Sequence, residues 1–208
     1  MSAIYGEQPT SWLDGFDMSK HCADSKPDDV IFVDVAGGVG HQCGLLKAKL
    51  PELRGRFILE DLPMVTPQAL PIPGIESMGI DMWQGQPVKG SYDYCKSRIL
   101  LYSQIIGAKT YYMRMILHDY PDDKAIALLK ITAEAMAKES VLVIDELVIP
   151  NQNAHEHATQ FDMLMMGSLA SMERTEKQWK ASIEKAGLNL IKMKSYGPAG
   201  ESAIVVSL

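Results

Sequence analysis

The sequence predicts an α/β fold, a doubly wound and mostly parallel sheet of seven strands with an antiparallel hairpin at its C-terminal edge. Three observations predict it. Apolar runs alternate with helical patterns through most of the 208 residues, which is typical of parallel strands joined by crossover helices. A glycine-rich turn follows the first apolar run, and only the short turn YGPAGE separates the last two.

The first half of the chain is expected to hold three strands and one helix. Short apolar runs at 31–35, 56–59 and 75–79 read as buried strands, and 42–50 reads as a helix. The glycines of VDVAGGVG lie between the first strand and this helix.

The second half continues the alternation of strands and helices and then ends in two strands that we expect to be antiparallel. Thr175 and Gln178 form a capping-box pattern, which marks the start of a helix through Lys185, and Gly187 is suited to end it. After the polar loop NQNAHEHAT we expect a Met-rich helix. The remaining elements are strands at 111–117 and 141–148, a helix at 122–138, and two final strands at 189–195 and 202–207. The whole pattern is Rossmann-like.

Composition excludes several classes of function. A formal net charge of −6 disfavours nucleic acid, because such binding relies on clustered Lys and Arg. No window approaches ~18 uninterrupted apolar residues, and the start resembles no signal peptide. Cys22, Cys43 and Cys95 form no CxxC pair, so we expect no zinc site and a reduced, cytoplasmic protein. His155 and His157 have no third ligand placed by the sequence, and we expect no metal there.

The glycine turn suits a nucleoside better than a pyrophosphate. A dinucleotide fingerprint needs a small third residue after two glycines, and Cys43 stands there after Gly38 and Gly40. His41 and Gln42 replace the Lys and Ser/Thr of a P-loop. A turn of this kind can instead face the amino-acid tail of a nucleoside ligand, because the helix that follows presents unpaired N–H groups.

Two aspartates follow neighbouring strands and support that interpretation. Asp61 ends the second strand, where a carboxylate can accept hydrogen bonds from both ribose hydroxyls. Asp81 follows the third strand and could contact the same ligand near its base. Either aspartate alone could equally be a solvated loop residue.

Six motifs in order then resemble one family. They are VDVAGGVG, LEDLP, GIDMW, YYMRMILHDYPDD, VLVIDELVIP and MERTEKQW. Together they resemble the catalytic domain of S-adenosylmethionine-dependent O-methyltransferases of the caffeate and flavonoid type, particularly fungal members that act in secondary metabolism. The resemblance covers about residues 30 to 207 and implies a phenolic or polyketide-like acceptor.

The resemblance also assigns residues. It implies that the cofactor S-adenosylmethionine contacts Gly37, Gly38, Gly40, Asp61, Asp81, Met82 and Arg114. It makes His118 the general base, oriented by Glu146 and Glu173, and places Asp162 and Met165 on the helix that lines the acceptor pocket. General chemistry agrees, because a sulfonium methyl is already activated and a neutral imidazole can take the proton of a phenol.

Three features depart from the family pattern. Complete members carry an N-terminal helical domain that forms a homodimer, whereas here residues 1–29 form only a lead-in to a domain at 30–208. Residues 91–107 are an insert without a recognised counterpart. Ala36 replaces a glycine, which is harmless if its φ is negative and costly otherwise.

Two other functions stay open on the sequence. A nicotinamide-dependent reductase would use the same sheet and Asp61, although no evident Tyr/Lys pair at YxxxK spacing is present. The second is a catalytically impaired fragment, which the insert and the short N-terminal lead-in would produce.

Overall fold

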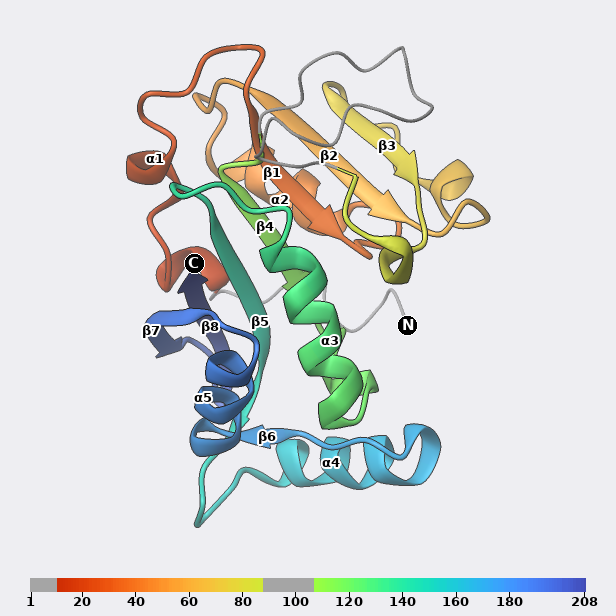
Figure 1. Cartoon of the computed structure of the whole chain (residues 1–208), viewed down its shortest axis with the longest axis vertical. Coiled ribbons are helices and arrows are strands. Elements are labelled where there is room, and N and C mark those ends of the chain that lie inside the picture. Colours follow the sequence, from red (N-terminus) through yellow and green to blue (C-terminus); the bar gives the residue numbers. More distant parts are fainter. Residues whose placement is uncertain (1–10, 88–106) are drawn as a thin grey trace.

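The predicted sheet is present. The computed structural model describes residues 11–87 and 107–208. Seven strands form one sheet in the order β3-β2-β1-β4-β5-β8-β7, and the short β6 pairs with β5 (Figure 1). The strands are β1 (Val30–Val35), β2 (Arg56–Asp61), β3 (Ile75–Gly79), β4 (Thr110–Arg114), β5 (Val141–Ile149), β6 (Arg174–Thr175), β7 (Asn189–Ser195) and β8 (Glu201–Ser207). The first five are parallel, and β8 runs antiparallel to β5 and β7.

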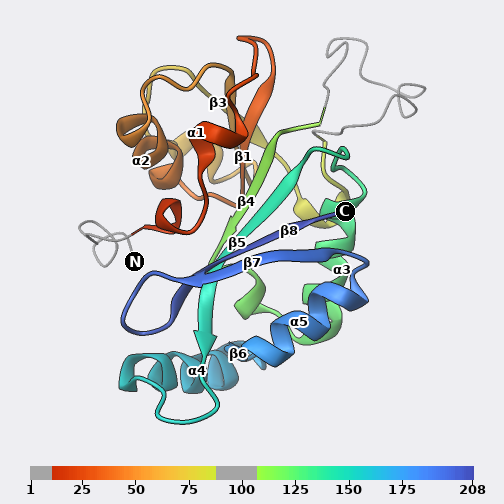
Figure 2. The ribbon, with the colours of Figure 1, turned by 90° about the vertical axis from the view of Figure 1, so that its left-hand side faces the viewer.

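Helices cover both faces of this sheet (Figure 2). On one face lie α1 (Met18–His21) and α2 (His41–Lys49), and on the other lie α3 (Asp122–Ala133) and α5 (Glu176–Lys185). The remaining α-helix, α4 (Glu156–Leu169), lies beyond the carboxyl end of β5. In the described residues no helix has the length and apolar character that a membrane crossing requires.

The N-terminal segment completes the core on the α2 face. Trp12, in the 3-10 helix η1 (Trp12–Asp14), is fully buried and stacks on Phe32 with ring centroids 5.9 Å apart. Met18 and Cys22 are buried in the same cluster. Because these residues fill a core rather than a surface, 11–22 is part of the described fold, whereas the side chains of 23–29 are exposed or half-buried.

Several boundaries differ from the sequence expectation. The strand predicted at 111–117 ends at Arg114, because Met115 has a φ of 51° and turns the chain into η4 (Leu117–Asp119). The helix predicted through Lys138 ends at Ala133. The His155 side chain caps α4, so the histidine pair lies at the start of a helix rather than in a loop.

The parallel strands bring their connections to one edge of the sheet. The glycine turn follows β1, η3 (Met82–Gln84) follows β3, and η4 follows β4. The short η2 (Thr66–Gln68) lies between β2 and β3. Ligands of doubly wound sheets bind at this carboxyl edge, where the site residues named above lie.

Candidate active site

A cleft opens at the carboxyl edge of the sheet. Its volume is about 390 Å³. The lining residues come from the ends of β1, β2, β3 and β4, from η3 and from η4: Ala36, Asp61, Leu62, Ile80, Asp81, Met82, Trp83, Arg114, Met115, Ile116, Asp119 and Tyr120. The structure therefore brings four of the predicted cofactor residues, Asp61, Asp81, Met82 and Arg114, to one cleft.

The glycines of the turn serve different physical needs. Gly38 and Gly40 have φ values of 62° and 90°, in the left-handed region that side chains disfavour. A Cβ on Gly37 would lie 2.4 Å from Cγ of Asp34, so this position has no room for a side chain. Ala36 has a φ of 53°, which is the costly case for a residue that carries a methyl group.

Asp34 is a buried carboxyl beneath this turn that the sequence reasoning missed. It is 1% exposed, and burial raises its pKa to about 7. The Cys43 thiol donates to Asp34 Oδ2 at 3.6 Å, which explains a cysteine at the third fingerprint position. The available signal was an acidic residue within the otherwise apolar strand VIFVDV.

Asp61 ties the end of β2 to the glycine turn. Its Oδ2 accepts a hydrogen bond from Gly38 N at 2.7 Å, and its Oδ1 accepts one from Leu62 N at 2.7 Å. The Asp81 carboxylate accepts from Trp83 N at 3.0 Å and from Gln84 Nε2 at 3.1 Å. A carboxylate has about four acceptor sites, so both residues keep capacity for a ligand in the cleft.

Arg114 is held at the cleft by a buried acid. Its Nη1 lies 2.8 Å from Oδ2 of Asp145. The hydroxyls of Tyr112 and Tyr196 also donate to the Asp145 carboxylate, each at 2.5 Å. Asp145, Tyr112 and Tyr196 lie far apart in the sequence, and no local pattern indicated that they meet.

His118 lies at the corner after β4, with one ring nitrogen directed at a glutamate. Nδ1 is 2.6 Å from Oε1 of Glu173 and 3.9 Å from Oε2 of Glu146. Nε2 lies 3.4 Å from Oδ1 of Asp119, which lines the cleft. Burial lowers the pKa of His118, but the Glu173 hydrogen bond and the Glu146, Glu173 and Asp119 charges outweigh it and raise the pKa to about 9.

Glu146 mainly holds the backbone of that corner. Its Oε1 accepts from Ile116 N at 2.9 Å and from Leu117 N at 2.8 Å. Its Oε2 has no hydrogen-bond partner among the described residues. Burial raises the pKa of Glu146 to about 7, partly offset by the charge of His118.

The helix α4 contributes a side chain that holds the segment carrying Glu173. Asp162 Oδ1 accepts the backbone N–H of Glu173 at 2.9 Å, so its carboxylate fixes a neighbour of His118. Met165 is 7% exposed, whereas Met163 and Met166 are 68% and 65% exposed. Whether Asp162 and Met165 contact an acceptor stays a prediction.

His118, Glu146 and Glu173 also offer three potential metal-ligand atoms within 4.8 Å of one another. The hydrogen bond between Nδ1 and Glu173 and the two backbone bonds to Glu146 account for this arrangement without a metal ion. A base oriented by carboxylates has the same geometry.

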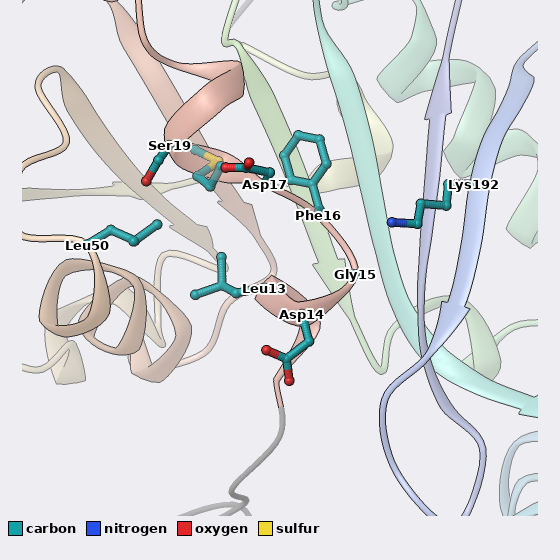
Figure 3. A pocket seen from close by; sticks show the side chains of 9 residues that line it. Leu13, Asp14, Gly15, Phe16, Asp17, Ser19, Leu50 and Lys192 are labelled. Carbon is teal, nitrogen blue, oxygen red and sulfur yellow. The ribbon is translucent and has the colours of Figure 1, made fainter.

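A second hollow of about 320 Å³ lies between the N-terminal segment and β7 (Figure 3). Its acidic residues Asp14 and Asp17 accept from the backbone N–H groups of Ser11 and Lys20 as helix caps. None of the described residues lines both hollows. Because the acidic side chains of the second hollow serve as helix caps, we take the cleft beside His118 as the candidate active site.

Comparison with known families and proteins agrees with the sequence motifs. The O-methyltransferase domain family matches residues 29–189. Demethylsterigmatocystin 6-O-methyltransferase stcP of Emericella nidulans is 36% identical over 201 residues, which are 96% of this chain and 90% of that protein. The chain spans about half the length of several other curated fungal relatives that it matches.

Solved structures share the fold over nearly the whole chain. The complex of LepI with SAM is 37% identical, with a TM-score of 0.83, over 98% of this chain and 50% of that one. A structure titled "A Pericyclic Reaction enzyme" is also 37% identical, with a TM-score of 0.84 and the same coverage. The insert predicted at 91–107 falls outside the described residues, except for Gly107.

Proposed function

This chain belongs to the O-methyltransferase domain family, and we propose on that premise that it transfers the methyl group of S-adenosylmethionine to a hydroxyl of a phenolic or polyketide-like small molecule. The observation that carries the proposal is the buried His118–Glu173 pair beside a cleft lined by Asp61, Asp81 and Arg114. A His–carboxylate pair could also donate a proton in a reductase, so it is the family membership that disfavours that alternative.

The lining of the cleft supports cofactor binding. Asp61 would accept the ribose hydroxyls, and Asp81 with Met82 would flank the adenine. The turn around Gly38, where an added Cβ would meet nothing within 4 Å, leaves open space for the amino-acid tail, and the Arg114 guanidinium lines the same cleft. When bound, the cofactor supplies an electrophilic methyl group on a sulfonium.

His118 would then remove the acceptor proton. Its Nδ1–H is donated to Glu173, which leaves the lone pair of Nε2 on the side of Asp119, a lining residue of the cleft. A base with a pKa of about 9 is close to a phenol, whose pKa resembles that of Tyr at ~10. Proton transfer is therefore nearly balanced, and the resulting phenolate is the stronger nucleophile.

Replacing the base tests this proposal. We expect His118→Ala to abolish methyl transfer to phenols while the Kd for S-adenosylhomocysteine, measured by calorimetry, changes little. His157→Ala, on the exposed start of α4, serves as the histidine control and should keep full activity. Equal loss of binding and turnover in His118→Ala would remove the base assignment.

One structural neighbour raises a second function. It is described as a pericyclic reaction enzyme, and a pericyclic rearrangement moves bonds without net proton transfer. A substrate screen read by mass separates the two functions, because methyl transfer adds one methyl group whereas rearrangement leaves the mass unchanged. The His118–Glu173 pair favours methyl transfer, since only that reaction must remove a hydroxyl proton.

We also propose a cytoplasmic protein in which two copies meet through α4, a different contact from the homodimer that the family resemblance assigns to an N-terminal helical domain. Met163, Leu164, Met166 and Leu169 are exposed apolar side chains on α4, and their concentration on one helix supports a contact with a second copy. The thiols of Cys22 and Cys43 are free and buried, as expected in a reducing compartment. Light scattering with and without a Met163→Lys substitution tests the dimer.

A further inference from the structure

We propose that Ser171 and Arg174 are positioning residues, which fix the backbone of the corner 117–120 so that His118 meets the cleft in a reactive orientation. The inference rests on the proposed function of His118. It concerns Ser171, which directly precedes the motif MERTEKQW, and Arg174 within it; of that motif only Glu173 has a role in the site described above.

Arg174 clamps both ends of the corner. Its Nη1 donates to the carbonyl of Leu117 at 2.9 Å, and its Nη2 donates to the carbonyl of Tyr120 at 2.8 Å. Its Nε lies 2.9 Å from Oδ1 of Asp122, at the start of α3. The side chain is fully buried, and its guanidinium lies over the ring of Trp179. A planar fork of donors can hold two carbonyls at once, which a Lys ammonium cannot match in geometry.

Ser171 acts on the middle of the same corner. Its Oγ lies 2.5 Å from the carbonyl oxygen of His118 and 2.7 Å from that of Tyr120. Ser171 is 4% exposed, so water cannot readily replace its hydroxyl. Together with Arg174, it binds the carbonyls of Leu117, His118 and Tyr120.

The same short segment anchors the ring. Glu173, between Ser171 and Arg174, accepts the Nδ1–H of His118. The segment is itself held, because Arg174 pairs with Val148 in β6–β5 and Asp162 accepts the N–H of Glu173. The backbone and the imidazole of His118 are therefore both held by the same segment, residues 171–174. Misplacement by about 1 Å can cost a factor of about 100 in rate.

The decisive variants are Ser171→Ala, Ser171→Thr and Arg174→Lys. We expect Ser171→Ala and Arg174→Lys to lower kcat at least tenfold while the Kd for S-adenosylhomocysteine stays within twofold. Ser171→Thr keeps the hydroxyl and should recover much of the loss. Ser19→Ala and Lys180→Met are matched controls, because Ser19 and Lys180 make only exposed contacts, to Glu52 and Glu176.

A second measurement does not depend on activity. NMR titration of the His118 imidazole reports its contact with Glu173, and a loosened corner should lower the His118 pKa in Ser171→Ala. An unchanged kcat with an unchanged titration would overturn the inference. A parallel loss of cofactor affinity and thermal stability would also overturn it, since that outcome describes only a structural role. If the wild-type chain methylates no acceptor, the proposed function fails, and the titration still decides whether Ser171 positions His118.

Discussion

At the scale of single residues, His118 sets the pH dependence of the proposed reaction. Burial lowers its pKa, but Glu173 and the neighbouring carboxylates raise it to about 9. Below that pH the ring is an imidazolium and cannot accept a proton, so kcat should rise about tenfold per unit up to near pH 9. In Glu173→Gln the pH at which kcat stops rising should move toward ~6.5, the ordinary pKa of His. Profiles of kcat from pH 6 to 10 measure the limb, and exposed Glu176→Gln serves as the control.

Ala36 is a second position where one residue has a predictable effect. Its φ of 53° places a methyl group in the left-handed region, at the edge of the cleft. Ala36→Gly should stabilise the fold by about 1 kcal/mol and lower the Kd for S-adenosylhomocysteine. Ala170, with a φ of 52° at the end of α4, is the matched control.

Ala170→Gly should produce a similar gain in stability without a change in cofactor affinity. Calorimetry and thermal unfolding measure both quantities. If Ala36→Gly leaves the Kd where it was, the methyl group strains the turn but does not face the ligand.

At the scale of elements, the glycine turn is constrained by the acid beneath it. Gly37→Ala would bring a Cβ to 2.4 Å from the buried Asp34 carboxyl. We expect this variant to lose thermal stability and at least tenfold in cofactor affinity, because the turn must move. In α4 an added Cβ at Gly167 meets nothing within 4 Å, so Gly167→Ala should instead stabilise by roughly 0.5–1 kcal/mol.

A double variant tests the cause of that loss. Shortening the acid in Asp34→Ala makes room for the Cβ, so the added effect of Gly37→Ala should shrink in that background. Strictly additive losses would mean that Asp34 is not the obstacle.

At the scale of the whole molecule, buried acids couple stability to pH. Burial raises the pKa of Asp34, Glu60 and Glu146 to about 7. Their folded pKa values exceed the unfolded ones, so their stabilisation is complete below about pH 4 and is lost as the pH rises to about 7. His118 adds a loss between about 6.5 and 9. The free energy of unfolding should therefore fall from pH 5 to pH 9, as measured by urea titration.

Glu60 offers a clean test of that coupling. Its Oε2 accepts from Gln86 at 2.7 Å, and its Oε1 has no partner among the described residues. Glu60→Gln keeps the shape without the titration, so it should flatten the fall between pH 5 and 7. Glu76→Gln is a control of opposite sign. Arg56 lowers the pKa of Glu76, so the Arg56–Glu76 pair stabilises the fold only above the usual pKa of a glutamate, and its loss should not flatten the fall. A pH profile unchanged by Glu60→Gln would contradict the assignment.

The sequence by itself determined which strands, helices and turns follow one another along the chain, and which of them carry polar site residues. Hydrophobic periodicity and turn residues are local, so the seven strands, the capped helix α5 and the glycine turn could be predicted with small boundary errors. Parallel topology then placed Asp61 and Asp81 at one edge, since parallel strands end on the same side, whereas Arg114 was assigned only through the family resemblance. His118 and Glu173 could be paired only through the family resemblance, because 55 residues separate them.

Only the tertiary structure decided which groups hold these residues in place. The contacts of Arg174, Ser171 and Asp145 join segments distant in sequence, and no periodicity encodes them. The sign of φ at Ala36 was likewise undecided, because an alanine in sequence is compatible with either sign and the packed turn selects one. Local patterns specify elements, whereas long-range packing specifies the orientation of a side chain within a site.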